Sequence, residues 1–174
     1  MPTYLITGGA ANGKSTFAET VLMSLPAPRY YIAAMRRDGE DARRKIAKHV
    51  AARAGRGIIT AECPTDVGET ELPRDCSVML ECLCTLTANE MFGEDGAIRD
   101  VYNKILYDIA ELESKCGSLI VVTNDVGSDG GGYGDGTMRY VETVGRLNAA
   151  LAKWFDNVYE VVCGIPLALK GGNG

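Results

Sequence analysis

The chain has 174 residues, of which 46% are hydrophobic and 24% charged, and its formal net charge is −5 at pH 7. This composition is typical of a soluble globular protein, and the length fits one domain over residues 1–174 with a hydrophobic core. The sequence contains no run of about 18 apolar residues, which is the length that a membrane-spanning helix needs. The first apolar strand begins almost at Met1, which leaves no room for a signal peptide, so we expect a cytoplasmic protein.

Short apolar runs alternate with helical patterns along the chain. Apolar strands separated by helices predict an α/β protein, a three-layer sandwich whose mostly parallel sheet is covered by helices on both faces. Right-handed crossovers then place the C-terminal ends of the strands, and the loops after them, at one edge of the sheet. The predicted strands are 3–7, 29–34, 57–61, 76–81, 118–123 and 157–163, and the predicted helices are 14–25, 39–52, 85–92, 98–115 and 137–155.

The first strand leads into a phosphate-binding loop (P-loop) with the pattern G-x-x-x-x-G-K-[ST]. An apolar strand precedes the loop and a helical pattern follows it, which is the setting that this motif requires. Its glycines let backbone N–H groups converge on phosphate oxygens, and Lys14 can reach the β- and γ-phosphates while the Ser15 hydroxyl ligates Mg²⁺. We therefore predict a nucleoside triphosphate site at Gly8, Gly9, Ala10, Ala11, Asn12, Gly13, Lys14 and Ser15.

His49 is the only histidine and lies in a basic segment. Between Arg36 and Arg56 there are eight basic and three acidic residues, so this segment carries +5 and the remainder −10. An acidic protein with one basic segment favours a local anionic ligand over a nucleic-acid surface. Neighbouring cations disfavour the imidazolium, so His49 should stay neutral and nucleophilic near pH 7. An imidazole nitrogen that attacks phosphorus forms a covalent phosphoramidate; the alternative is a solvated histidine on a charged helix.

Three carboxylates and a glycine-rich segment follow strands at the same edge. Glu81 ends a strand where P-loop proteins often have a metal-associated acid, so it assists Mg²⁺, accepts hydrogen bonds from a base or ribose, or is merely solvated. Glu62 ends the preceding strand and has the same possible roles, although the sequence supports them less strongly. Asp125 is a second candidate for metal or substrate contact. The segment 127–136 contains six glycines, and we interpret it either as a lid over a large substrate or as a surface loop without a role.

Further motifs are spread over nearly the whole chain. The P-loop is common to many families, whereas the T-G-G-A opening, the I-x-x-H-x-x-x-R run and V-T-N-[DE]-V-G in this order are more specific. The motifs are Leu5-Ile6-Thr7-Gly8-Gly9-Ala10, Gly13-Lys14-Ser15, Tyr31-Ile32-Ala33, Ile46-x-x-His49-x-x-x-Arg53, Thr60-Ala61-Glu62-Cys63, Leu80-Glu81-Cys82-Leu83, Val122-Thr123-Asn124-Asp125-Val126-Gly127, Gly145-Arg146-Leu147-Asn148 and Gly164-Ile165-Pro166-Leu167. With these motifs the chain resembles the bifunctional adenosylcobinamide kinase / adenosylcobinamide-phosphate guanylyltransferases of cobalamin biosynthesis.

The resemblance implies two reactions at one nucleotide site, with adenosylcobinamide and its phosphate as corrinoid substrates. ATP or GTP donates its γ-phosphoryl group to the corrinoid, and GTP then donates GMP through a guanylylated histidine, with loss of pyrophosphate. On this interpretation His49 is the GMP-accepting nucleophile, and Glu62 and Glu81 contact nucleoside groups, a role that competes with the metal role of Glu81. A homotrimer is implied as well. The residues that would line the nucleotide are Ala33, Ala34, Met35, Val50, Ala51, Ala52 and Arg53.

Two departures from the family pattern and two other functions stay open at this point. Lys45 stands where the family usually has Arg, and a glycine-rich stretch follows Gly127 where the family has an apolar segment with proline. A P-loop small-molecule kinase without a covalent step is one alternative. A nucleotide-binding regulator is another, although Thr123-Asn124-Asp125 lacks the lysine of the guanine-reading N-K-x-D sequence.

Overall fold

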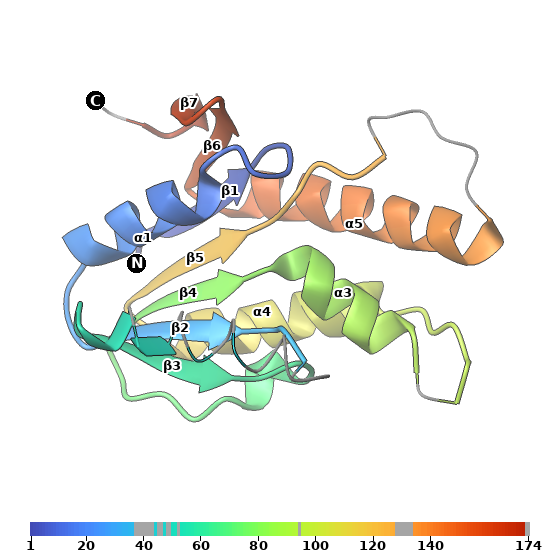
Figure 1. The fold of residues 1–174 in the computed structure, drawn as a ribbon, viewed down its shortest axis with the longest axis horizontal. Helices are drawn as coiled ribbons and strands as arrows, with labels where there is room; N and C mark the ends of the chain where they lie inside the picture. Colours follow the sequence, from blue (N-terminus) through green and yellow to red (C-terminus); the bar gives the residue numbers. More distant parts are fainter. Residues whose placement is uncertain are drawn as a thin grey trace.

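The computed structural model describes residues 1–36, 44, 47, 50, 51, 53–93, 95–127 and 134–172, and the structural statements below refer to these residues. Seven strands, four helices and a short 3-10 helix have defined bounds (Figure 1). The strands are β1 (Thr3–Thr7), β2 (Arg29–Ala33), β3 (Ile58–Glu62), β4 (Ser77–Glu81), β5 (Ser118–Val122), β6 (Asn157–Val162) and β7 (Ile165–Lys170). The helices are α1 (Lys14–Ser24), η1 (Val67–Glu69), α3 (Leu83–Met91), α4 (Tyr102–Lys115) and α5 (Asp135–Trp154).

All seven strands belong to one sheet with the order β3-β2-β4-β5-β1-β6-β7. Strands β1 to β6 pair in parallel, and β7 pairs antiparallel with β6. Central strands such as β5 are buried at every position, which is why they read as continuous apolar runs rather than as alternating patterns. The mostly parallel sheet predicted from the sequence is confirmed.

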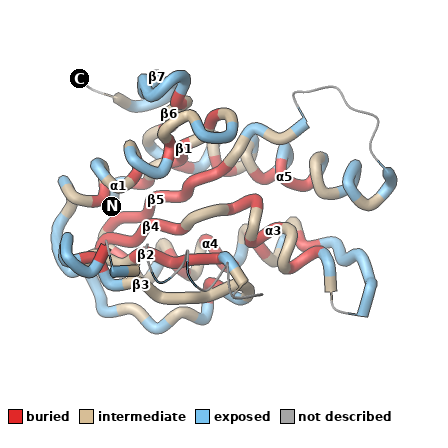
Figure 2. Tube along the Cα trace, in the orientation of Figure 1, coloured by how far each residue is buried: buried red, intermediate tan, exposed pale blue. Residues whose placement is uncertain are grey.

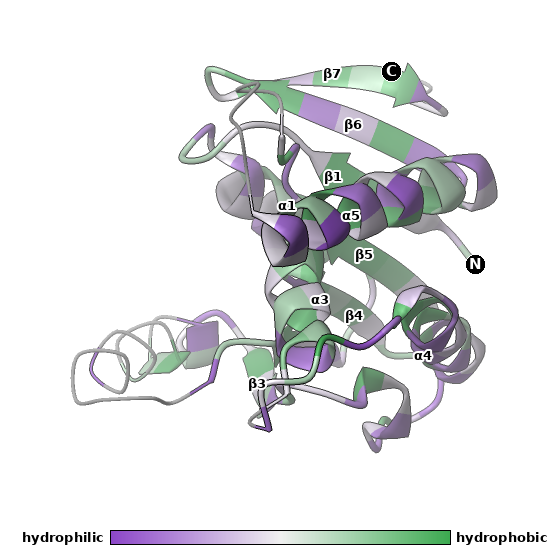
Figure 3. Cartoon of the chain, turned by 90° about the vertical axis from the view of Figure 1, so that its right-hand side faces the viewer, coloured by the Kyte–Doolittle hydropathy of each residue, from purple (hydrophilic) through white to green (hydrophobic). Residues whose placement is uncertain are grey.

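Helices cover both faces of this sheet. On one face, Ala18 and Leu22 of α1 pack against Met79 and Ile120 of the central strands. The other face packs against α3, α4 and α5, and in Figure 2 the buried residues follow the central strands and the helix sides toward them. In Figure 3 the central strands are green, whereas α5 carries both purple and green residues, as expected for a helix with one solvated side. The three-layer arrangement is therefore confirmed as well.

Most predicted boundaries agree with the structure within two residues, and the largest difference is the start of α4. The helix was expected from residue 98, but Ile98 pairs with Phe92 in an isolated antiparallel bridge, and α4 begins only at Tyr102. Much of the predicted helix 39–52 lies outside the described residues. Those that are described there, Arg44, Ala47, Val50 and Ala51, are helical, and the helix continues through Arg53 and Ala54.

Strand β7 was not predicted. All six of its residues are exposed, and one is Pro166, a residue that is uncommon inside strands. It is joined to β6 by Cys163 and Gly164, which have φ values of 50° and 81°, a two-residue hairpin turn with both residues in the left-handed region. No helix within the described ranges combines the length and apolar composition that a membrane span needs.

Candidate nucleotide-binding site

The P-loop follows the C-terminal end of β1 and leads into α1, as predicted. Gly8, Ala11 and Gly13 have φ values of 138°, 57° and 87°, so the chain turns sharply and ends in Gly13 as the N-cap of α1. The α1 N-terminus provides unpaired backbone N–H groups and partial positive charge. Nζ of Lys14 lies 2.5 Å from the carbonyl oxygen of Gly9, and the side chain is almost completely buried against the loop. The loop thus has the geometry of a phosphate cradle.

Segments distant in the sequence hold the P-loop in place. A Cβ atom on Gly8 would lie 2.4 Å from the carbonyl oxygen of Val161 in β6, so only glycine fits there. The N–H of Gly164, in the β6–β7 turn, donates to the carbonyl oxygen of Asn12 at 3.0 Å. On the other side, the N–H of Asp125 donates to the carbonyl oxygen of Gly8 at 3.3 Å. The turn and the loop after β5 therefore brace the P-loop.

Glu81 connects the P-loop with the β2 strand. The Ser15 hydroxyl donates a hydrogen bond to Oε1 of Glu81, and the Tyr31 hydroxyl donates to Oε2 at 2.8 Å. Burial, and secondly the negative charge of Glu81, raise the pKa of Tyr31, which keeps the phenol a donor. A hydroxyl and a carboxylate side by side are oxygen ligands of the kind that Mg²⁺ prefers. Asp125, the other metal candidate, is exposed in the loop after β5.

A cavity of about 440 Å³ opens beside this carboxylate on the α1 face of the sheet. Its volume is within the range of small-molecule and cofactor sites. Six predicted site residues line it together, from the P-loop, β2, the following helix and β4: Ser15, Ala33, Met35, Val50, Arg53 and Glu81. The remaining lining residues are Thr16, Glu19, Tyr31, Thr60, Cys82 and Thr85. The structure thus brings separate parts of the predicted site into one cavity.

Arg53 closes one side of the cavity. Its guanidinium carbon lies 3.3 Å from the ring centroid of Tyr31, a cation–π contact, and its Nε lies 3.4 Å from Oε1 of Glu19 on α1. Arg56 also pairs with Glu19, but it lies outside the cavity lining and its side chain is 47% exposed. Val50 and Arg53 share one face of their helix because they are three residues apart.

Other predicted residues lie apart from the cavity. Ala34 is fully buried in the core on the opposite face, where its N–H donates to the backbone carbonyl oxygen of Glu81 and its own carbonyl oxygen accepts from the Asn89 side-chain amide. Glu62 ends β3 in register with Ala33 but is not among the described lining residues, and Ala51 is exposed. Several other predicted residues lie outside the described part of the chain: Lys45, His49, Ala52 and the segment 128–133 of the glycine-rich loop.

Tyr31 and Thr60 are cavity residues that sequence reasoning missed. They face each other in the β2–β3 pairing, and paired residues project to the same side of a sheet. The signal was present, since Tyr31 lies two positions before Ala33 and Thr60 two positions before Glu62, both of which were site candidates. Strand alternation from those candidates indicates the same face.

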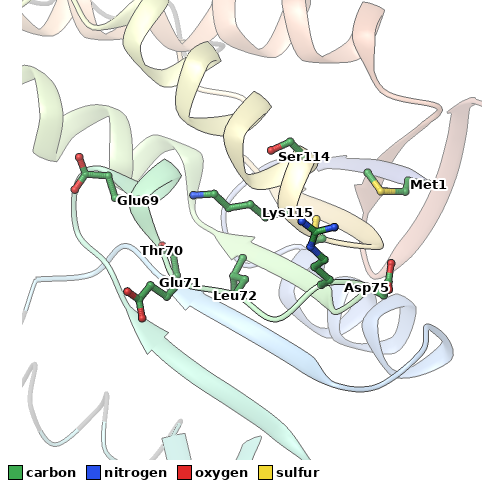
Figure 4. Close-up of a pocket in the computed structure, with 10 residues that line it drawn as sticks. Met1, Glu69, Thr70, Glu71, Leu72, Asp75, Ser114 and Lys115 are labelled. Atoms are coloured by element: carbon green, nitrogen blue, oxygen red, sulfur yellow. The ribbon is translucent and has the colours of Figure 1, made fainter.

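A second cavity, of about 640 Å³, lies at the opposite edge of the sheet (Figure 4). Its lining includes Met1, Asp75 and Cys116, which precede β1, β4 and β5, whereas the P-loop follows the far end of β1. Its side chains include the cations Arg74 and Lys115 and the carboxylates Glu69, Glu71 and Asp75, and the Lys115 ammonium already donates to the carbonyl oxygen of Gly68. No predicted site residue lines it.

The parallel sheet, the P-loop and the adjoining cavity define a P-loop nucleotide-binding α/β protein. The family model described as cobinamide kinase / cobinamide phosphate guanyltransferase matches residues 4–169, and the chain belongs to this family. It is 33% identical to the bifunctional adenosylcobalamin biosynthesis protein CobP of Pseudomonas aeruginosa, with 96% of each chain covered. It is 29% identical to the bifunctional adenosylcobalamin biosynthesis protein CobU of Salmonella typhimurium, and the alignment covers 95% of this chain and 98% of the relative.

Among solved structures, an ATPase of the type III secretion system of pathogenic bacteria aligns with a TM-score of 0.50 at 10% identity. The alignment covers 96% of this chain and 56% of the ATPase. At this identity the likeness concerns the fold alone.

Proposed function

We propose that the chain catalyses two successive transfers at one nucleotide site in a single domain over residues 1–174. ATP or GTP first phosphorylates adenosylcobinamide, and GTP then donates GMP to the phosphorylated corrinoid to give adenosylcobinamide-GDP. The observation that carries this proposal is the shared cavity, where Ser15 of the P-loop meets Val50 and Arg53, which flank His49 in the sequence. A cytoplasmic location is part of the same proposal.

In the kinase reaction, the hydroxyl oxygen of the corrinoid's aminopropanol arm attacks the γ-phosphorus. The bond between this phosphorus and the β–γ bridging oxygen breaks, the nucleoside diphosphate leaves, and the hydroxyl proton is released. Lys14 and the loop N–H groups stabilise the negative charge on the phosphoryl oxygens and on the leaving group. Before the nucleotide binds, the hydrogen bond to the carbonyl oxygen of Gly9 holds the Lys14 ammonium close to the phosphate site. When the nucleotide binds, Lys14 gives up this hydrogen bond and contacts the phosphate oxygens instead.

In the guanylyl transfer, an imidazole nitrogen of His49 attacks the α-phosphorus of GTP and pyrophosphate leaves. A phosphate oxygen of the corrinoid then attacks the same phosphorus, the P–N bond breaks, and neutral imidazole is regenerated. The P-loop holds the β- and γ-phosphates, which become the pyrophosphate. The basic residues around His49 favour its neutral, nucleophilic form and compensate the charge of the phosphates.

Ser15 and Glu81 fit a Mg²⁺ ion at the phosphate end of the cavity. The contact between the Ser15 hydroxyl and the Glu81 carboxylate supports this metal-side role of Glu81 over a purely nucleoside role. A bound Mg²⁺ supplies positive charge next to the phosphate oxygens. The nucleoside would lie against Ala33, Met35, Val50 and Arg53, with Ala51, Ala52 and Glu62 at its margin.

The same proposal includes a homotrimer. Support comes from the free edge of β7, where Ile165, Leu167 and Leu169 are 62%, 46% and 61% exposed. Exposed apolar residues on an unpaired strand edge are typical of a surface that another chain covers. Light scattering should give three times the chain mass, and Leu167→Lys should lower it. Tyr107→Lys, at an exposed position on α4, is the control. A monomeric wild-type protein would overturn this part.

The test of the two reactions uses GTP labelled at the α-phosphate with Mg²⁺. We expect acid-labile, base-stable label on the protein, and none on His49→Ala. With label at the γ-phosphate of ATP or GTP, adenosylcobinamide should become labelled in both proteins. Wild-type protein that phosphorylates the corrinoid without forming a covalent guanylyl adduct would refute the guanylyl transfer and leave a plain kinase.

A further inference from the structure

Thr60 lines the cavity, and its hydroxyl oxygen is buried without a hydrogen-bond partner. Among the described residues it is the one buried side-chain nitrogen or oxygen atom without a hydrogen-bond partner. Buried hydroxyl groups in native proteins nearly always have a partner, because losing hydration without replacement is unfavourable. Valine has nearly the same shape and the same preference for strands, and it would fill this position without that cost. A partner from outside the chain accounts for the hydroxyl.

The position of Thr60 shows which part of a ligand it can reach. Thr60 pairs with Tyr31, so both face the cavity from the same side of the sheet. Glu81, the carboxylate that meets the P-loop serine, is on β4, and β2 lies between β4 and β3. Two strand spacings separate Glu81 from Thr60 across the sheet, roughly 10 Å. Thr60 therefore lies at the end of the cavity remote from the phosphates.

Apolar side chains elsewhere in the cavity suit a nucleoside. Ala33, Met35 and Val50 provide apolar contact for a flat base, and they line the same cavity as Thr60. A largely apolar wall with one or a few placed polar groups is typical of nucleoside-sized ligand sites. A hydroxyl both donates and accepts, so it can bond a ring nitrogen, an exocyclic group or a ribose hydroxyl.

We infer that the Thr60 side chain rotates about its Cα–Cβ bond to another staggered rotamer when the nucleotide binds, so that its hydroxyl makes a direct hydrogen bond to the nucleoside and contributes to its affinity. This inference rests on the proposed nucleotide site. It adds a binding residue on β3 that neither the P-loop pattern nor the basic segment indicates. It also assigns the two ends of the cavity, with Ser15 and Glu81 at the phosphates and Thr60 at the nucleoside.

The test is calorimetric binding of two ligands to the full-length protein with Mg²⁺. The first is a GTP analogue with a methylene bridge between the α- and β-phosphorus, which cannot release pyrophosphate. The second is inorganic pyrophosphate, which lacks a nucleoside. Thr60→Val should bind the analogue about fivefold to tenfold more weakly, as expected for one lost hydrogen bond. Its affinity for pyrophosphate should stay within twofold of wild type, and Thr60→Ser should regain most of the lost affinity.

Two controls separate binding from folding. Ile59→Val alters the neighbouring residue of β3, which is 49% exposed, and should bind both ligands as wild type does. Without ligand, Thr60→Val should melt at the wild-type temperature or above, because an unsatisfied hydroxyl has been removed. An analogue affinity within twofold of wild type for Thr60→Val, or an equal loss for pyrophosphate, would overturn the inference alone. Failure of the wild-type protein to bind the analogue would overturn the proposed nucleotide site and the inference with it.

Discussion

The Tyr31 hydroxyl donates a 2.8 Å hydrogen bond to Oε2 of Glu81, while the Ser15 hydroxyl donates to Oε1 of the same carboxylate. Tyr31 is therefore a positioning residue, since it fixes the orientation of the acid that faces the P-loop serine. Outer partners of this kind commonly change metal affinity or activity by about tenfold or more when removed.

Tyr31→Phe should lower the rate of phosphoryl transfer about tenfold and raise the Mg²⁺ concentration needed for half-maximal rate. The physical reason is that Glu81 loses the donor that fixes one of its oxygens. Initial rates measured over a range of Mg²⁺ concentrations give both quantities. Tyr30→Phe is the matched control, because Tyr30 lies next in β2, on the opposite face of the sheet. A wild-type Mg²⁺ profile in Tyr31→Phe would contradict the positioning role.

Arg53 and Arg56 both pair with Glu19, but only Arg53 lines the cavity and stacks on Tyr31. A desolvated cation–π contact contributes about 2 kcal/mol, whereas an exposed ion pair contributes less than about 1 kcal/mol. Arg53→Ala should therefore lose about 2 kcal/mol of unfolding free energy and weaken GTP binding at least tenfold. Arg56→Ala should lose less than about 1 kcal/mol and keep its affinity for GTP.

Urea unfolding and calorimetric titration measure the two effects. Arg53→Lys tests the nature of the contact, since an ammonium lacks the flat surface that a guanidinium lays on an aromatic ring, and it should not restore wild-type affinity. Equal losses of affinity in Arg53→Ala and Arg56→Ala would show that the charge near Glu19 matters rather than the contact with Tyr31.

The sheet and the P-loop were predictable because their causes are local in the sequence. Strands buried on both faces must be apolar throughout, and the glycines of the loop are required by its backbone angles. The contact between Gly8 and Val161 was not predictable, because the two residues are far apart in the chain. The contact involves the backbone carbonyl of Val161, so it does not restrict which side chain stands at that position. Strand β7 was missed although Ile165, Leu167 and Leu169 alternate along it, because Pro166 within this run is unfavourable for a strand.

The cavity residues likewise include some that local sequence predicts and others that depend on contacts between distant segments. Glu81 was a candidate because strand ends in parallel sheets converge at one edge, but its two hydrogen-bond donors come from α1 and β2. A tyrosine and a threonine inside strands are ordinary strand formers, so composition alone gives Tyr31 and Thr60 no functional meaning. Only strand register, which the sequence does not state, places them opposite each other in the cavity wall.

Gly8→Ala should disrupt the P-loop, because the new Cβ would lie 2.4 Å from the carbonyl oxygen of Val161 and the φ of 138° is strained for alanine. We expect a loss of about 2 kcal/mol or more in unfolding free energy and no measurable transfer activity. Gly145→Ala is the control, since nothing lies within 4 Å of its Cβ position and it belongs to α5. That variant should be up to about 1 kcal/mol more stable, with wild-type activity. Full activity in Gly8→Ala would show that the close approach to β6 is dispensable.

Asp156 should make the stability of the protein depend on pH in the acid range. Its Oδ2 accepts hydrogen bonds from the N–H and the hydroxyl of Thr3 at 3.0 and 2.9 Å, which joins the start of β6 to β1. These bonds, first the backbone N–H and then the hydroxyl, lower the pKa of Asp156 below its ordinary value. The unfolded chain has an aspartate pKa of about 3.9, so the contribution is fully present above that pH and disappears as the pH falls through the lower folded pKa.

Asp156→Asn should remove this dependence. At pH 7 the variant should be less stable by under about 1 kcal/mol, because Asp156 is exposed and solvent screens its charge. The difference from wild type should shrink as the pH falls from 5 to 2, which urea unfolding at several pH values measures. Glu71→Gln, at an exposed position in the loop after η1, serves as the control for a general loss of negative charge. A difference between Asp156→Asn and wild type that stays constant down to pH 2 would assign the contribution to the hydrogen-bond geometry of the side chain and not to its charge.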